Sequence, residues 1–284
     1  MIKKFVITSL AVFALSAAQA QVQTPPTSTK SEVHQVVGLT DVKIDYSRPN
    51  MRGRLVFGDL VPYGRLWRTG ANMNTVVSFA NDVEIDGKTL KKGSYAIYTI
   101  PKVEEWEVIF YKDTNNWGLP DKWDESKIAL STKVKVQNLD RKFETFTMAV
   151  NNVNIDYADL EIMWERTLVP VRFKVPTDNL AMESIAETFE GPKIVDYYAA
   201  AEYFYLTGKD LSKALTWINN AIDKSGEKVP YYFVRLKSQI QAKAGDKVGA
   251  VATAKVALDL AEKANNLDYV KMNKDAIKEW SKAI

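Results

Sequence analysis

The amino-acid sequence predicts an α+β protein of two domains, an N-terminal antiparallel β-sandwich followed by an all-α helical domain. A change of periodicity leads to this prediction. Over residues 33–176 apolar and polar residues alternate, as they do in strands. Over residues 177–284 apolar residues recur every three or four positions and alanine becomes frequent, which is typical of helices. The chain of 284 residues is long enough for two domains.

Residues 1–20 have the three parts of a secretory signal peptide. Lys3 and Lys4 form a charged start, residues 5–15 form an apolar stretch, and a small-x-small cleavage pattern ends at Ala20. The apolar stretch is too short to span a bilayer, so an uncleaved anchor is the weaker interpretation and we expect no membrane span after cleavage. The segment therefore predicts export, with the periplasm favoured over secretion.

Composition excludes several classes of function. The chain has no cysteine, which rules out disulfides, thiol catalysis, a lipid-modified cysteine and cysteine-rich metal sites. Without Lys3 and Lys4 the 38 basic residues become 36, against 35 acidic ones, so the net charge falls to +1. Nucleic-acid binding has no support from so small a charge. Residues 21–32 are rich in Gln, Thr, Pro and Ser, and we expect a flexible tail there.

Eight or nine strands are expected in the first domain. Val42, Ile44 and Tyr46 alternate with polar residues, and Asp86-Gly87 is a type I′ hairpin signal inside the segment 82–90. We expect segments 75–80 and 82–90 to pair, and 94–100 to pair with 106–111. The remaining strands are expected at 127–136, 143–150, 153–164 and 168–175. Strands at this spacing without intervening helices favour an antiparallel sandwich, with a barrel as the nearest alternative.

The second domain contains an internal repeat. Asp210, Ala214 and Ala221 recur 36 residues later as Asp246, Ala250 and Ala257. This order resembles the tetratricopeptide repeat, in which small residues let paired helices approach closely, although that repeat is 34 residues long. We expect two degenerate repeats at 194–226 and 229–264, with flanking helices at 178–190 and 267–283. Asp210 and Asp246 are the expected N-caps, and Pro192 and Pro230 suit first helical positions.

Residues 46–72, YSRPNMRGRLVFGDLVPYGRLWRTGAN, form a block that is rich in arginine. The block holds five of the nine arginines, and glycine and proline interrupt it too often for one regular helix or strand. Arginine pairs bidentately with carboxylate or phosphate, so arginines beside aromatic residues can form a pocket for an anionic ligand. The candidate ligand-binding residues are Arg48, Arg52, Arg65, Arg68, Tyr46, Tyr63, Trp67 and Asn72.

A structural role for the same block competes with ligand binding and is favoured over it. Irregular buried backbone needs donors, and Arg48, Arg54 and Arg68 could satisfy loop carbonyls and internal acids. The apolar residues of the block, such as Leu55 and Phe57, suggest a loop packed inward. Guanidinium groups that share an open cavity would favour anion binding. If each is bonded within the loop, replacing Arg68 by Met should lower stability.

Signatures of catalysis are weak, and we predict no catalytic residue, no metal site and no cofactor. The single histidine, His34, lies beside the expected tail. With one histidine and no cysteine, a usual zinc site and a serine–histidine–acid triad are nearly excluded. An alternative site is a loop in which acids stand beside aromatics, a pattern known from sugar-binding surfaces. A solvated surface turn is the favoured interpretation of that loop. Its candidate residues are Trp117, Asp121, Trp123 and Asp124.

Tyrosines are dense in the helical domain, for example at Tyr197, Tyr198, Tyr231 and Tyr232. Packing between repeat helices explains most of them. A tyrosine-lined face for a protein partner is the alternative.

Several segments resemble an exported bacterial family catalogued as domain of unknown function 2911. The string FGDLVPYGRLWRTGAN at residues 57–72 is the specific one, and YSRP at 46–49, GSYAIYTIP at 93–101 and ETFT at 144–147 also fit. The resemblance covers residues 33–175. It implies an exported β-rich domain and brings no activity, cofactor or catalytic residue.

These observations predict an exported, non-enzymatic binding or interaction protein. The sandwich would carry an anion or carbohydrate site near the arginine block, and the helical repeats would contact a protein. The first alternative is a hydrolase in which two of Asp59, Asp121, Asp124 and Glu125 converge on Arg48 or Arg68. The second is a structural or assembly protein without a small-molecule ligand.

Overall fold

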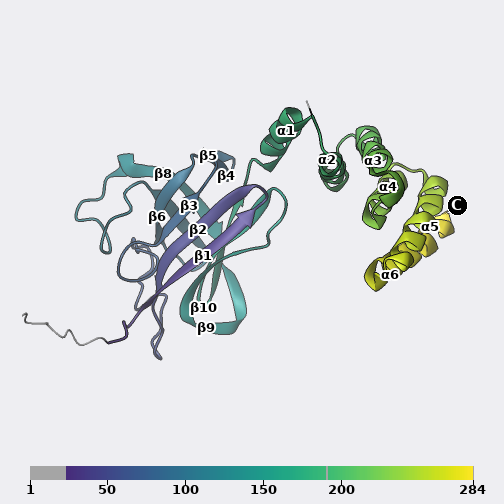
Figure 1. The fold of residues 1–284 in the computed structure, drawn as a ribbon. Helices are drawn as coiled ribbons and strands as arrows, with labels where there is room; N and C mark the ends of the chain where they lie inside the picture. The colour runs from purple at the N-terminus through teal and green to yellow at the C-terminus, as the bar shows by residue number, and fades with distance from the viewer. Residues whose placement is uncertain (1–23, 190, 284) are drawn as a thin grey trace, which may run out of the picture. The chain divides into compact units, whose positions relative to one another are not determined.

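A computed structural model describes residues 24–189 and 191–283, so the predicted signal peptide lies outside the described residues. The chain divides into two compact units between Val175 and Pro176. Strands make up the first unit and helices make up the second (Figure 1). This is the predicted α+β architecture. None of the helices among the described residues combines the length and apolarity that crossing a membrane requires.

The first unit consists of two antiparallel sheets, neither of which closes into a barrel. The larger sheet has the order β1-β2-β3-β6-β7-β8, and the smaller has the order β5-β4-β10-β9. The strands of the larger sheet are β1 (Thr29–Val37), β2 (Thr40–Arg48), β3 (Val76–Phe79), β6 (Gly93–Ile100), β7 (Glu105–Tyr111) and β8 (Ile128–Lys135). Those of the smaller sheet are β4 (Val83–Ile85), β5 (Lys88–Leu90), β9 (Gln137–Asn151) and β10 (Tyr157–Lys174).

One hydrophobic core lies between the two sheets. Ile44 and Val77 from the larger sheet and Leu160 and Phe173 from the smaller one belong to the same buried cluster. The alternation along β2 shows how this arises, because Val42, Ile44 and Tyr46 point inward while the residues between them stay more accessible. The predicted sandwich is thus confirmed.

Three strand predictions need correction. Strand β1 begins at Thr29, inside the predicted tail, and it pairs with β2 along its whole length. It is an edge strand with mostly accessible side chains, so apolar alternation does not mark it. Segments 75–80 and 82–90 do not pair, because β3 joins the larger sheet while β4 joins β10 in the smaller one. The two strands expected at 153–164 and 168–175 are one strand, β10, with irregular register on either side of Glu165.

The hairpin between β4 and β5 has the predicted turn. Asp86 and Gly87 both have positive φ, 51° and 71°, as a type I′ turn requires. Ile85 faces Lys88 across it.

The second unit contains six α-helices among the described residues. They are α1 (Thr177–Thr188), α2 (Ile194–Thr207), α3 (Leu211–Ser225), α4 (Tyr231–Lys243), α5 (Lys247–Lys263) and α6 (Leu267–Trp280). Helices α2 and α3 pack as one pair and α4 and α5 as another. Ala214, Ala221, Ala250 and Ala257, the alanines of the repeat, are fully buried.

Both predicted aspartate caps are present. The Asp210 carboxylate accepts a hydrogen bond from the Lys213 amide at 3.0 Å, and Asp246 accepts one from the Gly249 amide at 2.8 Å. Pro230 is the N-cap of α4 rather than its first helical residue, and Pro192 lies two residues before α2.

The Asp210 cap can be tested with a matched pair of variants. Asp210→Ala should lower the free energy of unfolding by about 1 kcal/mol, since it leaves a helix N–H without its acceptor. Asp210→Asn should retain most of the stability, because asparagine caps as well as aspartate. Urea unfolding followed by circular dichroism at 222 nm measures both. Equal losses in the two variants would show that the cap is not the source of the effect.

Candidate functional site

The arginine block forms an irregular connection between β2 and β3 that is attached to both sheets. The Met51 amide donates to the Glu144 carbonyl at 2.9 Å, and the Phe146 amide donates to the Pro49 carbonyl at 2.8 Å. These bonds tie the start of the connection to β9. Further along, Trp67 and Thr99 exchange two backbone hydrogen bonds of 2.7 and 2.9 Å, which tie it to β6.

Gly70 is needed where the connection crosses the end of β2. Its φ is 138°, and an added Cβ would lie 2.9 Å from the Thr75 hydroxyl and 3.3 Å from the Ser47 carbonyl oxygen. A larger residue would therefore be strained at this positive φ, and its Cβ would also come too close to the Ser47 backbone. The close approach places the residues on either side of Gly70 against the sandwich.

Trp67 anchors the connection through an aromatic cluster. Its ring meets Phe57, Trp106 and Phe146 edge-on, with centroids 6.1, 6.1 and 5.5 Å away. It lies nearly parallel to Trp164, at a centroid distance of 6.0 Å and an angle of 17°. Trp106 belongs to β7 and Trp164 to β10, so the cluster joins both sheets. Trp67 itself is only half-buried.

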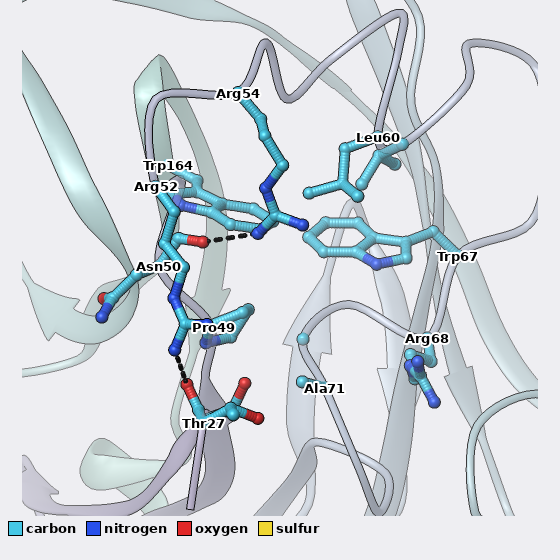
Figure 2. Close-up of a pocket in the computed structure, with 13 residues that line it drawn as sticks. Thr27, Pro49, Asn50, Arg52, Arg54, Leu60, Trp67, Arg68, Ala71 and Trp164 are labelled. Atoms are coloured by element: carbon cyan, nitrogen blue, oxygen red, sulfur yellow. Dashed lines mark hydrogen bonds between the residues drawn. The ribbon is translucent and has the colours of Figure 1, made fainter.

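A pocket of about 370 Å³ opens beside this cluster (Figure 2). Its floor includes the two indoles, and three arginines of the block stand around it. The lining residues are Thr27, Ser28, Pro49, Asn50, Arg52, Arg54, Leu60, Val61, Trp67, Arg68, Gly70, Ala71 and Trp164. None of these 13 residues is acidic.

The three arginines of the pocket differ in how the protein uses them. Arg54 donates from Nε to the Met51 carbonyl and from Nη2 to the Asn50 carbonyl, both at 2.8 Å. Arg52 makes one side-chain hydrogen bond, from Nη2 to the Thr27 carbonyl at 3.1 Å.

Arg68 is half-buried, and its guanidinium donates to no acceptor among the described residues. It packs directly on the backbone of Gly118, where an added Cβ would lie 3.0 Å from Arg68 Nη1.

Glu144 contacts the arginine block but forms no ion pair with these cations. Glu144 uses Oε1 to accept the backbone amide of Arg52 at 2.7 Å, rather than its guanidinium. Within the described part of the chain, Arg52, Arg54 and Arg68 form no ion pair. The pocket therefore presents unused N–H donors and positive charge.

Only some of the residues predicted from the sequence meet in the pocket. Arg52, Trp67 and Arg68 line it, whereas Arg48, Arg65, Tyr46, Tyr63 and Asn72 do not. Arg48 braces β9, donating to the Phe146 carbonyl at 3.1 Å and to the Thr147 hydroxyl at 2.8 Å.

The other residues outside the pocket have varied surroundings. Tyr46 is buried and donates to the Met148 carbonyl. Asn72 donates at 3.4 Å to the Ser28 carbonyl and the Ser47 hydroxyl. Tyr63 is partly exposed beside Gly58, and Arg65 is exposed without a polar partner in the described chain.

Sequence reasoning missed several pocket residues. Arg54, which the sequence suggests only as a brace, both braces the loop and lines the pocket. Trp164 lies on β10, about a hundred residues away from the block along the chain, and no local pattern connects the two. Thr27 and Ser28 lie in the segment expected to be a tail.

The residues of the alternative loop site do not line the arginine pocket. Trp117 is 70% exposed, and Asp121 is exposed as well. Trp123 instead stacks on Tyr111 at a centroid distance of 4.6 Å. Hydrogen bonds from the Ser126 hydroxyl and then the Ser126 amide hold the pKa of Asp124 below its usual value.

The convergence of carboxylates that the hydrolase alternative requires is also missing from the pocket. Asp59, Asp121, Asp124 and Glu125 are not among its lining residues. His34 lies on β1, 2.7 Å from the Asp41 carboxylate, and the described residues contain no cluster of three His, Asp or Glu side chains placed to hold a metal ion.

The different contacts of the arginines predict different effects on stability. Arg54→Met should lower the free energy of unfolding by about 1–2 kcal/mol, because two carbonyls lose a charged donor. Arg68→Met should leave it unchanged or raise it, since a half-buried cation without a partner is removed. Arg65→Met, at an exposed position of the same connection, is the matched control. Guanidinium unfolding followed by tryptophan fluorescence measures all three, and a large loss in Arg68→Met would contradict the assignment.

Comparison with known proteins gives one match. No curated protein and no solved structure matches this chain. The profile of one family matches residues 28–173, which include both sheets and all but one of the pocket residues. The chain belongs to the family described as "Protein of unknown function (DUF2911)".

Proposed function

We propose that this protein is an exported binding protein whose arginine pocket takes a small organic anion. The observation that carries the proposal is that three arginines and no acidic residue line one pocket. Trp67 packs against the buried core and the arginine loop is hydrogen-bonded to both sheets, which favours a preorganised site.

Electrostatics favours an anion over a neutral ligand. Opposite charges 4 Å apart interact by about 4 kcal/mol at an effective dielectric constant of 20, against about 1 kcal/mol in bulk water. Desolvation of the ions offsets part of this gain. For Arg68 this desolvation cost is small, because the folded protein already holds its side chain half-buried and without a partner. Carboxylate and phosphate groups match its planar set of donors.

The pocket separates this proposal from its two alternatives. A hydrolase working through carboxylates would need acids beside the arginines, and the lining residues supply none. A purely structural protein would have no reason to keep Arg68 free of protein acceptors. For the helical unit we propose contact with a protein partner, which rests on its paired helices.

Anion binding can be tested with citrate, sulfate and inorganic phosphate. We expect at least one of them to raise the melting temperature of the wild-type protein, and the effect to shrink at high ionic strength. Arg68→Gln should weaken binding about tenfold or more, because it removes a charged donor. Arg65→Gln, with the same charge change outside the pocket, should bind as the wild type does. Equal losses in both variants would indicate nonspecific charge attraction instead.

Export has its own test. When the full chain is produced in a Gram-negative host, the protein in the periplasmic fraction should begin at Gln21, as N-terminal sequencing would report. Ala18→Arg combined with Ala20→Arg should block this processing. Recovery of the wild-type chain from the cytoplasm with residues 1–20 attached would contradict export.

A further inference from the structure

We infer that the anionic group of the ligand is carried on a sugar ring, so that the pocket recognises an acidic saccharide. This inference rests on the proposed anion site and narrows its ligand. It draws on three further features of the pocket: an aromatic platform, a wall of uncharged polar groups, and the position of the free arginine.

The platform is the half-buried indole of Trp67. Phe57, Trp106 and Phe146 pack against this ring at interplanar angles of 76°, 80° and 79°, and Trp164 lies nearly parallel to it. The ring therefore cannot turn without disturbing the core of the sandwich. A flat apolar surface of this kind suits the C–H face of a pyranose ring, whereas inorganic phosphate or sulfate has no apolar part to place on it.

The polar wall is supplied by Thr27 and Ser28. The hydroxyls of Thr27 and Ser28 make no hydrogen bond to other described residues, although both residues line the pocket. The Asn50 side chain does not belong to this wall, because it points away from Trp67 in Figure 2 and its oxygen accepts from the Thr145 hydroxyl at 2.7 Å. Sugar hydroxyls both donate and accept, so they match the hydroxyls of the wall. An aromatic or aliphatic acid would leave this wall without a counterpart.

The arginines stand on different sides of the platform. In the view of Figure 2 the indole of Trp67 lies between Arg54 and Arg68. Arg54 is fixed by the carbonyls of Asn50 and Met51, whereas the Arg68 guanidinium donates to no acceptor among the described residues. We therefore assign the charged substituent of the sugar to Arg68. The volume of about 370 Å³ is near the lower end of the range of roughly 300–1,000 Å³ for small-ligand pockets, which suits one or two sugar residues.

Isothermal titration and tryptophan fluorescence can test this with defined probes. The acidic sugars are glucuronate, a galacturonate disaccharide and glucose 6-phosphate. The first two carry a carboxylate and the third carries a phosphate, so they show which charged group is preferred. The comparison probes are glucose, acetate, benzoate and inorganic phosphate. We expect at least one acidic sugar to bind about tenfold more tightly than every comparison probe and to change the tryptophan fluorescence of the protein.

The variants assign the contacts within the same experiment. Arg68→Gln should weaken the binding of the acidic sugar about tenfold or more and leave the affinity for glucose unchanged. Arg65→Gln should change neither affinity. Arg68→Lys keeps the charge but loses the planar set of guanidinium donors, so its affinity should lie between those of Arg68→Gln and the wild type. Circular dichroism of each variant checks that the fold is retained.

The possible failures are distinguishable. If acetate, benzoate or phosphate binds as tightly as every acidic sugar, the saccharide inference is wrong while the anion pocket stands. If glucose binds as tightly as glucuronate, the role of Arg68 is wrong. If none of these probes and none of the simple anions binds, the proposed function itself fails.

Discussion

The packing of Trp67 is the contact on which the structure of the first unit depends. Its ring touches aromatic side chains from both sheets, and its backbone exchanges two hydrogen bonds with Thr99 on β6. A long connection without regular structure cannot satisfy its own polar groups or bury much apolar surface unaided. Packing one large, half-buried aromatic residue against the shared core supplies part of that surface and sets where the rest of the connection must run.

The arginines follow from this constraint. Once Trp67 is inserted, the backbone on either side of it passes over the edges of the sheets, where carbonyl groups need donors. Arg48 and Arg54 supply these donors to β9 and to the loop itself. Arg52 and Arg68 are left around the pocket that forms beside the indole. Bracing and pocket lining are thus divided among neighbouring arginines of one connection, and Arg54 takes part in both.

Much of the fold could be predicted because its signals are local. Alternation along β2, the Asp86-Gly87 turn and the aspartates before α3 and α5 each depend on residues close together in the chain. The errors arise where the deciding partner is distant. Strand β1 carries no apolar alternation because it lies at an edge, and only its pairing with β2 makes it a strand. The position of β4 beside β10 brings together residues about ninety positions apart.

The candidate site divides in the same way. The sequence by itself determined the residue types, since a block with five arginines, aromatics and one acid already indicates chemistry suited to anions. It also determined the two-unit architecture and the family, through periodicity and through the string at residues 57–72. Only the tertiary structure decided which arginines donate hydrogen bonds to carbonyls and which line a pocket. It alone brought Trp164, Thr27 and Ser28 to that pocket. The physical reason is that a guanidinium group has the same donors in either role, so its use depends on the acceptors that folding places within its reach.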